Sequence, residues 1–356
     1  MPNFRPQDLR QLGYDLFEKC GCSAEDACTV TDHLVDSSLY GHDSHGTIRY
    51  YEYVNQIREG RFNPRGTPQI VQEKACTAVV DGGGALGQVG AAFAARLAMS
   101  KAREKGVGVV ALRNTAHVGR AGAYPLMAAR EGLLGLAFVN AGKLGRQIAP
   151  YGGLDGKLST NPIAFAAPRR NADPVMVDMT TSVVAEGKVR VYQNRGHQLP
   201  EGWIIDHQGQ PATDPRAYTG KPPGAILPLG GVVGYKGYCL SFVVEILGGA
   251  LSGEGCAAGE RIMHSNGVLL TVYDLEQFTD LDSYYDELEI LIGHVHTSRI
   301  DPRVGEILVP GEPEFRSARR REVEGIPVDD TTWSRICEAA KSVGLDPAPW
   351  EKLQLS

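Results

Sequence analysis

The sequence at residues 77–90 reads TAVVDGGGALGQVG, and this stretch decides which kind of fold the chain can adopt. Five strand-like residues lead into Gly82–Gly87, which match the Gly-x-Gly-x-x-Gly fingerprint of Rossmann dinucleotide sites ahead of a helical segment. Two features count against such a site. Gly90 puts another glycine into the first turn of the helix, and the next strand, Gly106 to Arg113, runs straight into a loop instead of toward a third parallel strand. We therefore favour a glycine-rich turn between strand and helix over a nucleotide site.

Strand-like and helical segments alternate along the middle of the chain, which indicates a mixed α/β (α+β) core. The expected strands are Thr77–Asp81, Gly106–Arg113, Leu133–Asn140, Ile163–Ala166, Val175–Val177 and Gly267–Tyr273. The expected helices are Ala91–Glu104, Ala123–Glu131 and a buried one at Tyr238–Leu251. The segment Lys188–Pro223 is rich in Gly, Pro, Asp and His, and predicts long irregular loops.

The amino-terminal part of the chain reads as a helical lobe. Helices are expected over Pro6–Cys20, over Ser23–Leu39 with Ser23 as its cap, and from Ser44 to near Gly60. The turn residues Asn63–Gly66 mark its boundary. A terminal helix at Thr331–Ser342 could pack back on this lobe. We expect residues 1–65 and 313–356 to form the helical lobe and residues 66–312 to form the mixed core.

Charge and cysteine usage argue against several classes of protein. A net charge of −6 with no basic stretch argues against nucleic acid as a partner. Seven scattered cysteines without a Cys-x-x-Cys pair suggest reduced thiols in the cytoplasm. The longest apolar stretch, residues 230–251, is interrupted by Lys236 and Glu245, and predicts a buried helix in place of a membrane span.

Groups suited to proton transfer gather in residues 41–53, which read GHDSHGTIRYYEY. In a helix that begins near Ser44, His45, Arg49 and Tyr53 would lie on one face. That face would offer an imidazole that can carry a proton, a guanidinium that can grip a carboxylate at two points, and a phenol. A second imidazole, His117, follows a predicted strand. The combination suits proton transfer on a small acidic substrate.

Two other chemistries find weaker support in the sequence. The pairs His42/His45 and His294/His296 offer metal ligands at close spacing, but neither is a zinc signature such as His-Glu-x-x-His. Ser44 lacks the Gly-x-Ser-x-Gly elbow of serine hydrolases. We therefore expect no metal site and no serine nucleophile.

Six motifs, in order along nearly the whole chain, resemble those of the malate/L-lactate dehydrogenase family, whose cofactor fold is not of the Rossmann type. The motifs are Gly41–Gly46, Asn114-x-x-His117-x-Gly119, Thr160–Phe165, Val177–Ser182, Gly234–Gly237 and Val309–Glu312. The resemblance implies the non-Rossmann fold of that family, NAD(H) or NADP(H) as cofactor, and a homodimer or an assembly of dimers. It also implies hydride transfer between the nicotinamide and C2 of a small 2-oxo or 2-hydroxy acid. Reduction of a cyclic imine carboxylate, or non-catalytic anion binding on the same fold, are the alternatives.

The resemblance also assigns roles by position. His45 and His117 look like the catalytic imidazoles, and which of the two donates the proton stays open. Arg49 resembles the contact to the substrate carboxylate, with Ser44, Tyr53 and Lys143 as further substrate contacts. The residues that look like cofactor contacts are His117, Thr160, Asn161, Val177, Asp178, Met179, Thr180, Tyr235, Lys236, Gly311 and Glu312.

Several of these residues also have an ordinary structural interpretation. Arg49 could pair with Glu52 or Glu59, Tyr53 could serve packing, and Asp178 could cap the next segment. One region departs from the family pattern, because residues 140–147 read NAGKLGRQ where the family is apolar or small. The two added cations, Lys143 and Arg146, suggest that the substrate carries a second anionic group.

Overall fold

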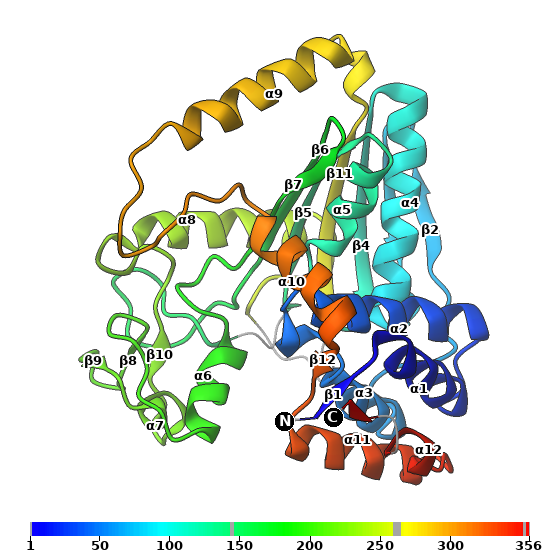
Figure 1. The fold of residues 1–356 in the computed structure, drawn as a ribbon, viewed down its shortest axis with the longest axis vertical. Coiled ribbons are helices and arrows are strands. Elements are labelled where there is room, and N and C mark those ends of the chain that lie inside the picture. The colour runs from blue at the N-terminus through cyan, green and yellow to red at the C-terminus, as the bar shows by residue number, and fades with distance from the viewer. Residues whose placement is uncertain (1, 143–145, 259–264, 352–353, 356) are drawn as a thin grey trace.

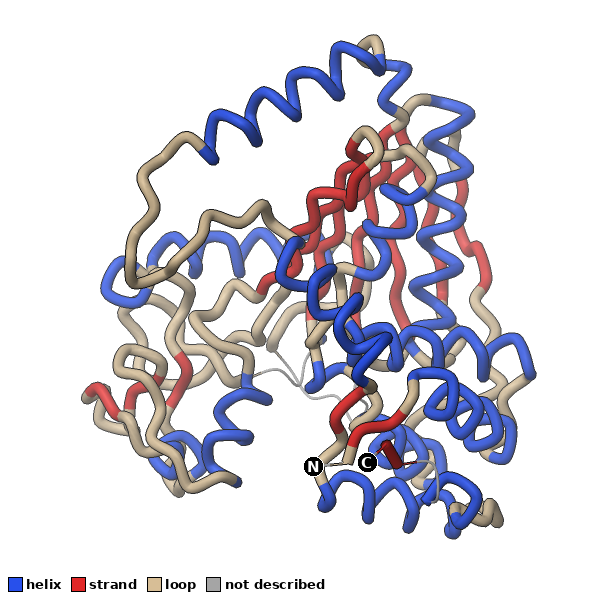
Figure 2. The backbone as a smooth tube through the Cα atoms, in the orientation of Figure 1, coloured by secondary structure: helices blue, strands red, loops and turns tan. Residues whose placement is uncertain are grey.

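The computed structural model describes residues 2–142, 146–258, 265–351 and 354–355, and centres on a seven-stranded sheet (Figures 1 and 2). The strand order is β2-β3-β4-β11-β5-β6-β7. In this sheet only β3 and β4 run parallel, and the other neighbouring pairs are antiparallel. The mixed α/β fold is thus confirmed. The bounds are β2 Gln69–Glu73, β3 Thr77–Asp81, β4 Val107–Thr115, β5 Leu134–Asn140, β6 Ile163–Arg169, β7 Ala172–Met179 and β11 Asn266–Tyr273.

Two helices, α4 (Gly87–Lys105) and α5 (Ala123–Arg130), cover one face of this sheet (Figure 1). Small residues let α4 lie close to the strands, since a Cβ on Gly108 of β4 would come within 2.0 Å of the carbonyl oxygen of Ala98. The alanines of α4 and the apolar residues of the strands form one buried cluster. The centre of the core therefore lies between α4, α5 and the middle strands β4, β11 and β5.

A second buried cluster joins helices from both ends of the chain. Ser23 caps the second helix by accepting from the amide of Asp26, as expected. The terminal helix contributes Trp333 and Ile336 to the same cluster as Leu9 and Leu34. A three-stranded sheet, β12-β1-β13, brings the two ends of the chain together (Figure 1). The elements are α1 Pro6–Lys19, α2 Ala24–Leu39, α3 Arg49–Arg58, α11 Asp330–Ser342, α12 Ala348–Glu351, β1 Asn3–Phe4, β12 Ile326–Pro327 and β13 Gln354–Leu355.

The expected helix from Ser44 is wrong in its start. A 3-10 turn, η1 (Asp43–His45), comes first, and α3 begins only at Arg49. Gly46 interrupts the helix with φ −98° and ψ −148°. A Cβ at Gly46 would lie 2.1 Å from the hydroxyl oxygen of Ser38, so the chain passes close to α2 at this point. The amide of Thr47 donates to the same hydroxyl at 3.0 Å, so the chain is held against α2 at the break, and His45 and Arg49 do not occupy successive turns of one helix.

The segment Lys188–Pro223 is more ordered than expected, because its apolar residues form a core of their own. Val189, Leu199 and Ile204 are buried together with Ile226. The prediction of irregular loops is therefore wrong over much of this region. The elements are α6 Glu186–Asn194, α7 Pro215–Thr219, β8 Ile204–Ile205, β9 Pro211–Ala212 and β10 Ala225–Ile226, with strand order β10-β8-β9.

The helix expected at Tyr238–Leu251 is present, but it is not buried. It consists of α8 (Tyr235–Val244) and a π-helical continuation, η4 (Glu245–Ala250). Phe242 and Ile246 are 50% and 52% exposed. The helices α9 (Leu281–His296), which projects from the body (Figure 1), and α10 (Glu312–Glu324) were also not anticipated. Among the described residues, no helix is long and apolar enough to cross a membrane.

The glycine-rich turn between β3 and α4 uses its own backbone amides. Those of Gly82 and Gly84 donate to the carbonyls of Arg113 and Asn114, both at 2.8 Å, and that of Gly83 donates to the Asp81 carboxylate at 2.9 Å. A phosphate at a helix N-terminus needs such amides for itself. The bonds support the interpretation of this segment as a structural turn.

Two alanine substitutions in this turn should separate a structural role from a cofactor role. Gly84 has φ +69° with only Asn63 near its absent Cβ, so Gly84→Ala should cost about 1–2 kcal/mol of stability and leave affinity for a nicotinamide cofactor unchanged. A Cβ on Gly87 would come within 2.2 Å of the His117 carbonyl oxygen, so Gly87→Ala should displace His117 and impair activity. Urea unfolding measures the stability of each variant, a fluorescence titration with NADH measures its cofactor affinity, and steady-state kinetics measure its activity. If Gly84→Ala bound the cofactor tenfold more weakly while its stability was unchanged, the structural role of this turn would be contradicted.

Candidate functional site

Three of the predicted site residues meet in the structure. The rings of His45 and His117 stack with centroids 5.5 Å apart and an interplanar angle of 26°. The Tyr53 hydroxyl lies 2.8 Å from Nδ1 of His117. The 3-10 turn supplies His45, α3 supplies Tyr53, and the loop after β4 supplies His117. Segments that are far apart in the sequence thus bring two imidazoles and a phenol together.

The loop that carries His117 is held by bonds to its neighbours on both sides. The amide of Ala116 donates to the carbonyl of Ala85 at 2.9 Å, and the amide of Val118 donates to the side chain of Asn266 at 2.9 Å. Gly87 at the start of α4 packs against the carbonyl of His117. These contacts fix the backbone of the loop from which the imidazole of His117 projects.

His45 lies in an environment that disfavours its charged form. Burial, and next the positive charge of Arg49, lower its pKa to about 3. Ser44 lies next to it, with Oγ 3.0 Å from Nδ1 of the ring. The imidazole of His45 is therefore neutral at neutral pH, and can accept a proton or share one in a hydrogen bond.

Arg49 stands at the first position of α3, beside His45. Its Nε donates to the carbonyl of Ser44 at 2.7 Å, and its guanidinium forms an ion pair with Glu52. The pairing with Glu52 that the sequence left open is thus present. A substrate carboxylate would have to share the guanidinium with Glu52 or displace it.

Gln88 belongs to the same cluster, and sequence reasoning missed it. It lies in the first turn of α4, is 0% exposed, and donates from Nε2 to the Tyr53 hydroxyl at 2.9 Å. A signal was present, because Gln88 is the one amide in a run of small and apolar residues that reads GQVGAAFAA. A polar side chain in such a run is buried with the helix face and needs a partner.

Asp178 holds the start of α5. Its carboxylate accepts from the amide of Gly122 at 2.9 Å and lies 3.9 Å from the guanidinium of Arg120. The two charged side chains are only 8% and 3% exposed. The sequence allowed Asp178 to cap the segment that follows it, whereas in the structure Asp178 supports the start of α5, which precedes it in the chain. Its neighbour Met179 is 41% exposed and points a large apolar side chain outward from the end of β7.

Thr160 and Asn161 lie in the link that leads into β6. The Asn161 side chain is buried and donates to Glu245 at 2.8 Å and to the Ser241 hydroxyl at 2.9 Å. Glu245 also accepts from Asn140 at 2.8 Å, and burial raises its pKa. The carbonyl of Thr160 accepts from the amide of Thr181. These bonds join the segment before β6, the segment after β7 and the π-helical turn.

The remaining predicted cofactor contacts lie on separate elements with contacts of their own. Val177 lies in β7, and the hydroxyl of Thr180 just beyond it donates to the carbonyl of Ser182 at 3.0 Å. Tyr235 begins α8, is 46% exposed, and has the Lys236 ammonium 6.0 Å from its ring centre. Gly311 has φ +99° at the start of α10, where Glu312 accepts from the amide of Val309. Lys143 lies outside the described residues.

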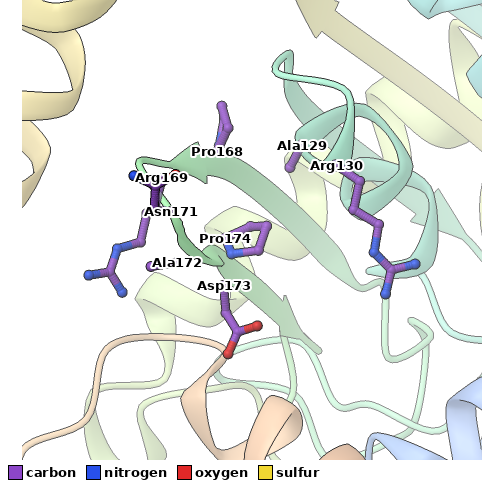
Figure 3. A pocket seen from close by; sticks show the side chains of 8 residues that line it. All are labelled: Ala129, Arg130, Pro168, Arg169, Asn171, Ala172, Asp173 and Pro174. Carbon is purple, nitrogen blue, oxygen red and sulfur yellow. The ribbon is translucent and has the colours of Figure 1, made fainter.

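A cavity of about 560 Å³ lies elsewhere, between the end of α5 and the β6–β7 turn (Figure 3). Its charged side chains already have partners. Arg130 donates to the Tyr40 hydroxyl, Arg169 makes two bonds to Glu289, and Asp173 pairs with Arg319. None of the predicted site residues that the structure describes lines this cavity. Within the described ranges, no three His, Cys, Asp or Glu residues are grouped to hold a metal ion.

Comparison with known proteins gives concordant results. The sequence model of the malate/L-lactate dehydrogenase family matches residues 4–337. A malate dehydrogenase of Pyrococcus horikoshii is 38% identical over 341 residues, covering 92% of each chain. The solved structure of a sulfolactate dehydrogenase from Methanocaldococcus jannaschii has a TM-score of 0.87 at 33% identity, covering 98% of this chain and 99% of the other.

A third relative is named for a different class of substrate, a cyclic imine carboxylate. The structure of a delta1-piperideine-2-carboxylate reductase from Pseudomonas syringae has a TM-score of 0.84 at 28% identity, covering 96% of this chain and 100% of the other. Together with the paired imidazoles and the mixed, non-Rossmann sheet, these matches agree with the resemblance drawn from the six motifs. The chain belongs to the malate/L-lactate dehydrogenase family.

Proposed function

We propose that this protein is an NAD(P)-dependent oxidoreductase that interconverts a small 2-oxo acid and the corresponding 2-hydroxy acid. The observation that carries the proposal is the stacked pair His45 and His117 beside Arg49. Proton transfer to or from the substrate oxygen needs an imidazole within hydrogen-bond reach, and a guanidinium fixes the carboxylate next to the reacting carbon. Membership of the family supports the same reaction type.

The residues around β7 and α8 fit a nicotinamide dinucleotide. The exposed side chains of Met179 and Tyr235 offer apolar and aromatic surface for the rings, and Lys236 offers a cation for a phosphate. In this proposal Val177, Thr180, Gly311 and Glu312 complete the contacts, while the buried side chains of Asn161 and Asp178 hold their segments in place. The bound nicotinamide supplies or accepts the hydride.

We assign the proton chemistry to the two histidines. The neutral ring of His45 can hydrogen-bond to the substrate oxygen, with Ser44 beside its other nitrogen. His117 lies within stacking distance and forms the second member of the acid–base pair. Arg49 orients the carboxylate, and so aims the reacting carbon.

Reduction of a cyclic imine carboxylate is the second candidate. The likeness to the piperideine carboxylate reductase favours it, because the same guanidinium would hold the carboxylate of such a substrate. We also propose that the substrate carries a second anionic group, as sulfolactate does. The proposal rests on two cations, Lys143 and Arg146, and the side chain of Arg146 is exposed.

An absorbance assay tests these proposals together. The purified protein is incubated with NADH or NADPH and with pyruvate, oxaloacetate, sulfopyruvate or piperideine-2-carboxylate, and the nicotinamide absorbance is followed. We expect oxidation of one cofactor with at least one 2-oxo acid. Turnover of the imine alone would replace the first candidate by the second. Cofactor or anion binding without turnover of any substrate would favour non-catalytic anion binding.

We also propose that the protein acts as a homodimer in the cytoplasm. The scattered cysteines, without a Cys-x-x-Cys pair, support a reducing compartment. Exposed apolar side chains on α8, its continuation η4, and α9 support a second copy as the partner, because monomeric proteins rarely expose large apolar patches to water. Sedimentation equilibrium should give twice the mass of the chain, and a monomer would contradict the proposal. The exposed residues are Phe242, Val243 and Ile246 of α8 and η4, and Ile290, Leu291 and Val295 of α9.

A further inference from the structure

A buried chain of three side chains ends on the imidazole of His117. Gln88 donates from Nε2 to the Tyr53 hydroxyl at 2.9 Å, and this hydroxyl lies 2.8 Å from Nδ1 of His117. Gln88 and Tyr53 are 0% and 2% exposed. The Tyr53 ring packs edge-on against Phe62 and also contacts Phe17, so its position is set by the core of the helical lobe. Water therefore has little access to the hydroxyl.

The hydroxyl has three polar neighbours and one proton. Besides Gln88 and Nδ1, it lies 3.3 Å from the backbone carbonyl oxygen of His117. A phenol can donate once and accept twice. If Tyr53 donated to Nδ1, its single proton could not also serve the contact with the carbonyl oxygen. If Nδ1–H donates to Tyr53, the phenol accepts from both Gln88 and His117, and donates to the carbonyl. Only the second arrangement uses all three contacts.

We propose that Gln88 and Tyr53 are positioning residues that keep a proton on Nδ1 of His117, so that Nε2 is the nitrogen that exchanges a proton with the substrate. When Nε2 takes the hydroxyl proton of a 2-hydroxy acid, the ring becomes an imidazolium with a proton on each nitrogen. When Nε2 returns that proton to the oxygen, the ring is again neutral with its proton on Nδ1. The Nδ1–H bond to Tyr53 is unchanged in both states, and no atom of the chain has to move.

Two further properties fit this role. Burial raises the pKa of Tyr53 to about 12, so the phenol stays protonated and keeps its donor bond to the carbonyl. The contact of Gly87 with the His117 carbonyl holds that acceptor in place. The logic is that of other catalytic histidines, in which a partner at one nitrogen selects the tautomer and leaves the other nitrogen for chemistry. The catalytic part of this inference rests on the proposed function, whereas the tautomer does not.

Nitrogen NMR of histidine-labelled protein reads the tautomer directly, without substrate or cofactor. A His117→Gln variant identifies the signals. In the wild type we expect a protonated Nδ1 and an unprotonated Nε2 for His117. In Tyr53→Phe we expect a shift toward the Nε2–H tautomer, and in the assay a kcat about 10- to 100-fold lower with KM changed less than threefold. Gln88→Met, which removes the amide but not the phenol, should cause a smaller change of the same kind.

Tyr50→Phe is the matched control. Tyr50 lies one turn before Tyr53 on α3, is equally buried, and donates to the carbonyl of Leu9 at 2.9 Å. It should lose a similar amount of stability and leave the His117 signals and kcat unchanged. An Nε2–H tautomer in the wild type, or unchanged signals and kcat in both Tyr53→Phe and Gln88→Met, would overturn the inference. If the wild type turned over no substrate, the proposed function would fail while the NMR result still decided the positioning role.

Discussion

Replacing His45 or His117 with alanine should lower kcat/KM for the 2-oxo acid substrate by about 10²–10⁴-fold. Positioned proton transfer contributes a factor of this size, and the two rings stack at 5.5 Å, so each shapes the surroundings of the other. The double variant should be little worse than the poorer single variant, because residues that act as a unit are not additive. Steady-state kinetics in both directions measure these losses.

His207→Ala is the control for these variants, because His207 is exposed in the turn between β8 and β9. It should retain wild-type kinetics. If only one of the two site variants lost activity while the other kept it within threefold, the acid–base pair would reduce to a single catalytic imidazole. Unfolding curves of all three variants establish that they are folded at the assay temperature.

Replacing Asp178 with alanine should lower the free energy of unfolding by about 3–5 kcal/mol even without cofactor. The change leaves the buried guanidinium of Arg120 without its carboxylate and the amide of Gly122 without its acceptor. Asp178→Asn keeps an acceptor oxygen for Gly122 and should lose less. Urea unfolding monitored by circular dichroism gives both values.

A second carboxylate on β7 provides the control. Asp173 pairs with Arg319, but both side chains are well exposed, so Asp173→Ala should cost at most about 1 kcal/mol. If Asp178→Ala were as stable as the wild type and lost only cofactor affinity, its role would be contact with the cofactor and not support of the α5 segment. The position of Asp178 at the end of an expected strand was compatible with both roles.

Local patterns in the sequence were enough to predict much of the sheet and its covering helices. The β3–α4–β4 unit and β5 appear within four residues of their expected bounds, because the apolar periodicity and the bounding glycines are local signals. The pairing of His45 with His117 was expected from the family motifs. The separate prediction that His45 shares one helix with Arg49 was wrong. Contacts with Ser38 in α2 break the helix at Gly46, and no local pattern contains that information.

Other features escaped prediction for different reasons. The helix α9 has a local signal, since Asp280 caps it by accepting from the amide of Ser283, and it was simply missed. The sequence could not predict that α8 is exposed. An apolar helix has the same sequence pattern whether its own chain covers it or a second copy would cover it. The burial of Gln88 has a local signal, but its partner Tyr53 depends on the packing of the helical lobe on the sheet.

The glycine-rich turn has a consequence for attempts to change the coenzyme preference of this protein. In Rossmann enzymes, the residues after such a turn and at the end of the next strand are the usual targets for exchanging NAD and NADP specificity. Here the amides of the turn donate to acceptors at the ends of β3 and β4, and Gly87 packs against the backbone of His117. Substitutions in it would alter the reaction rate before they altered the choice of coenzyme. A library aimed at that choice should instead sample the exposed residues after β7 and at the start of α8.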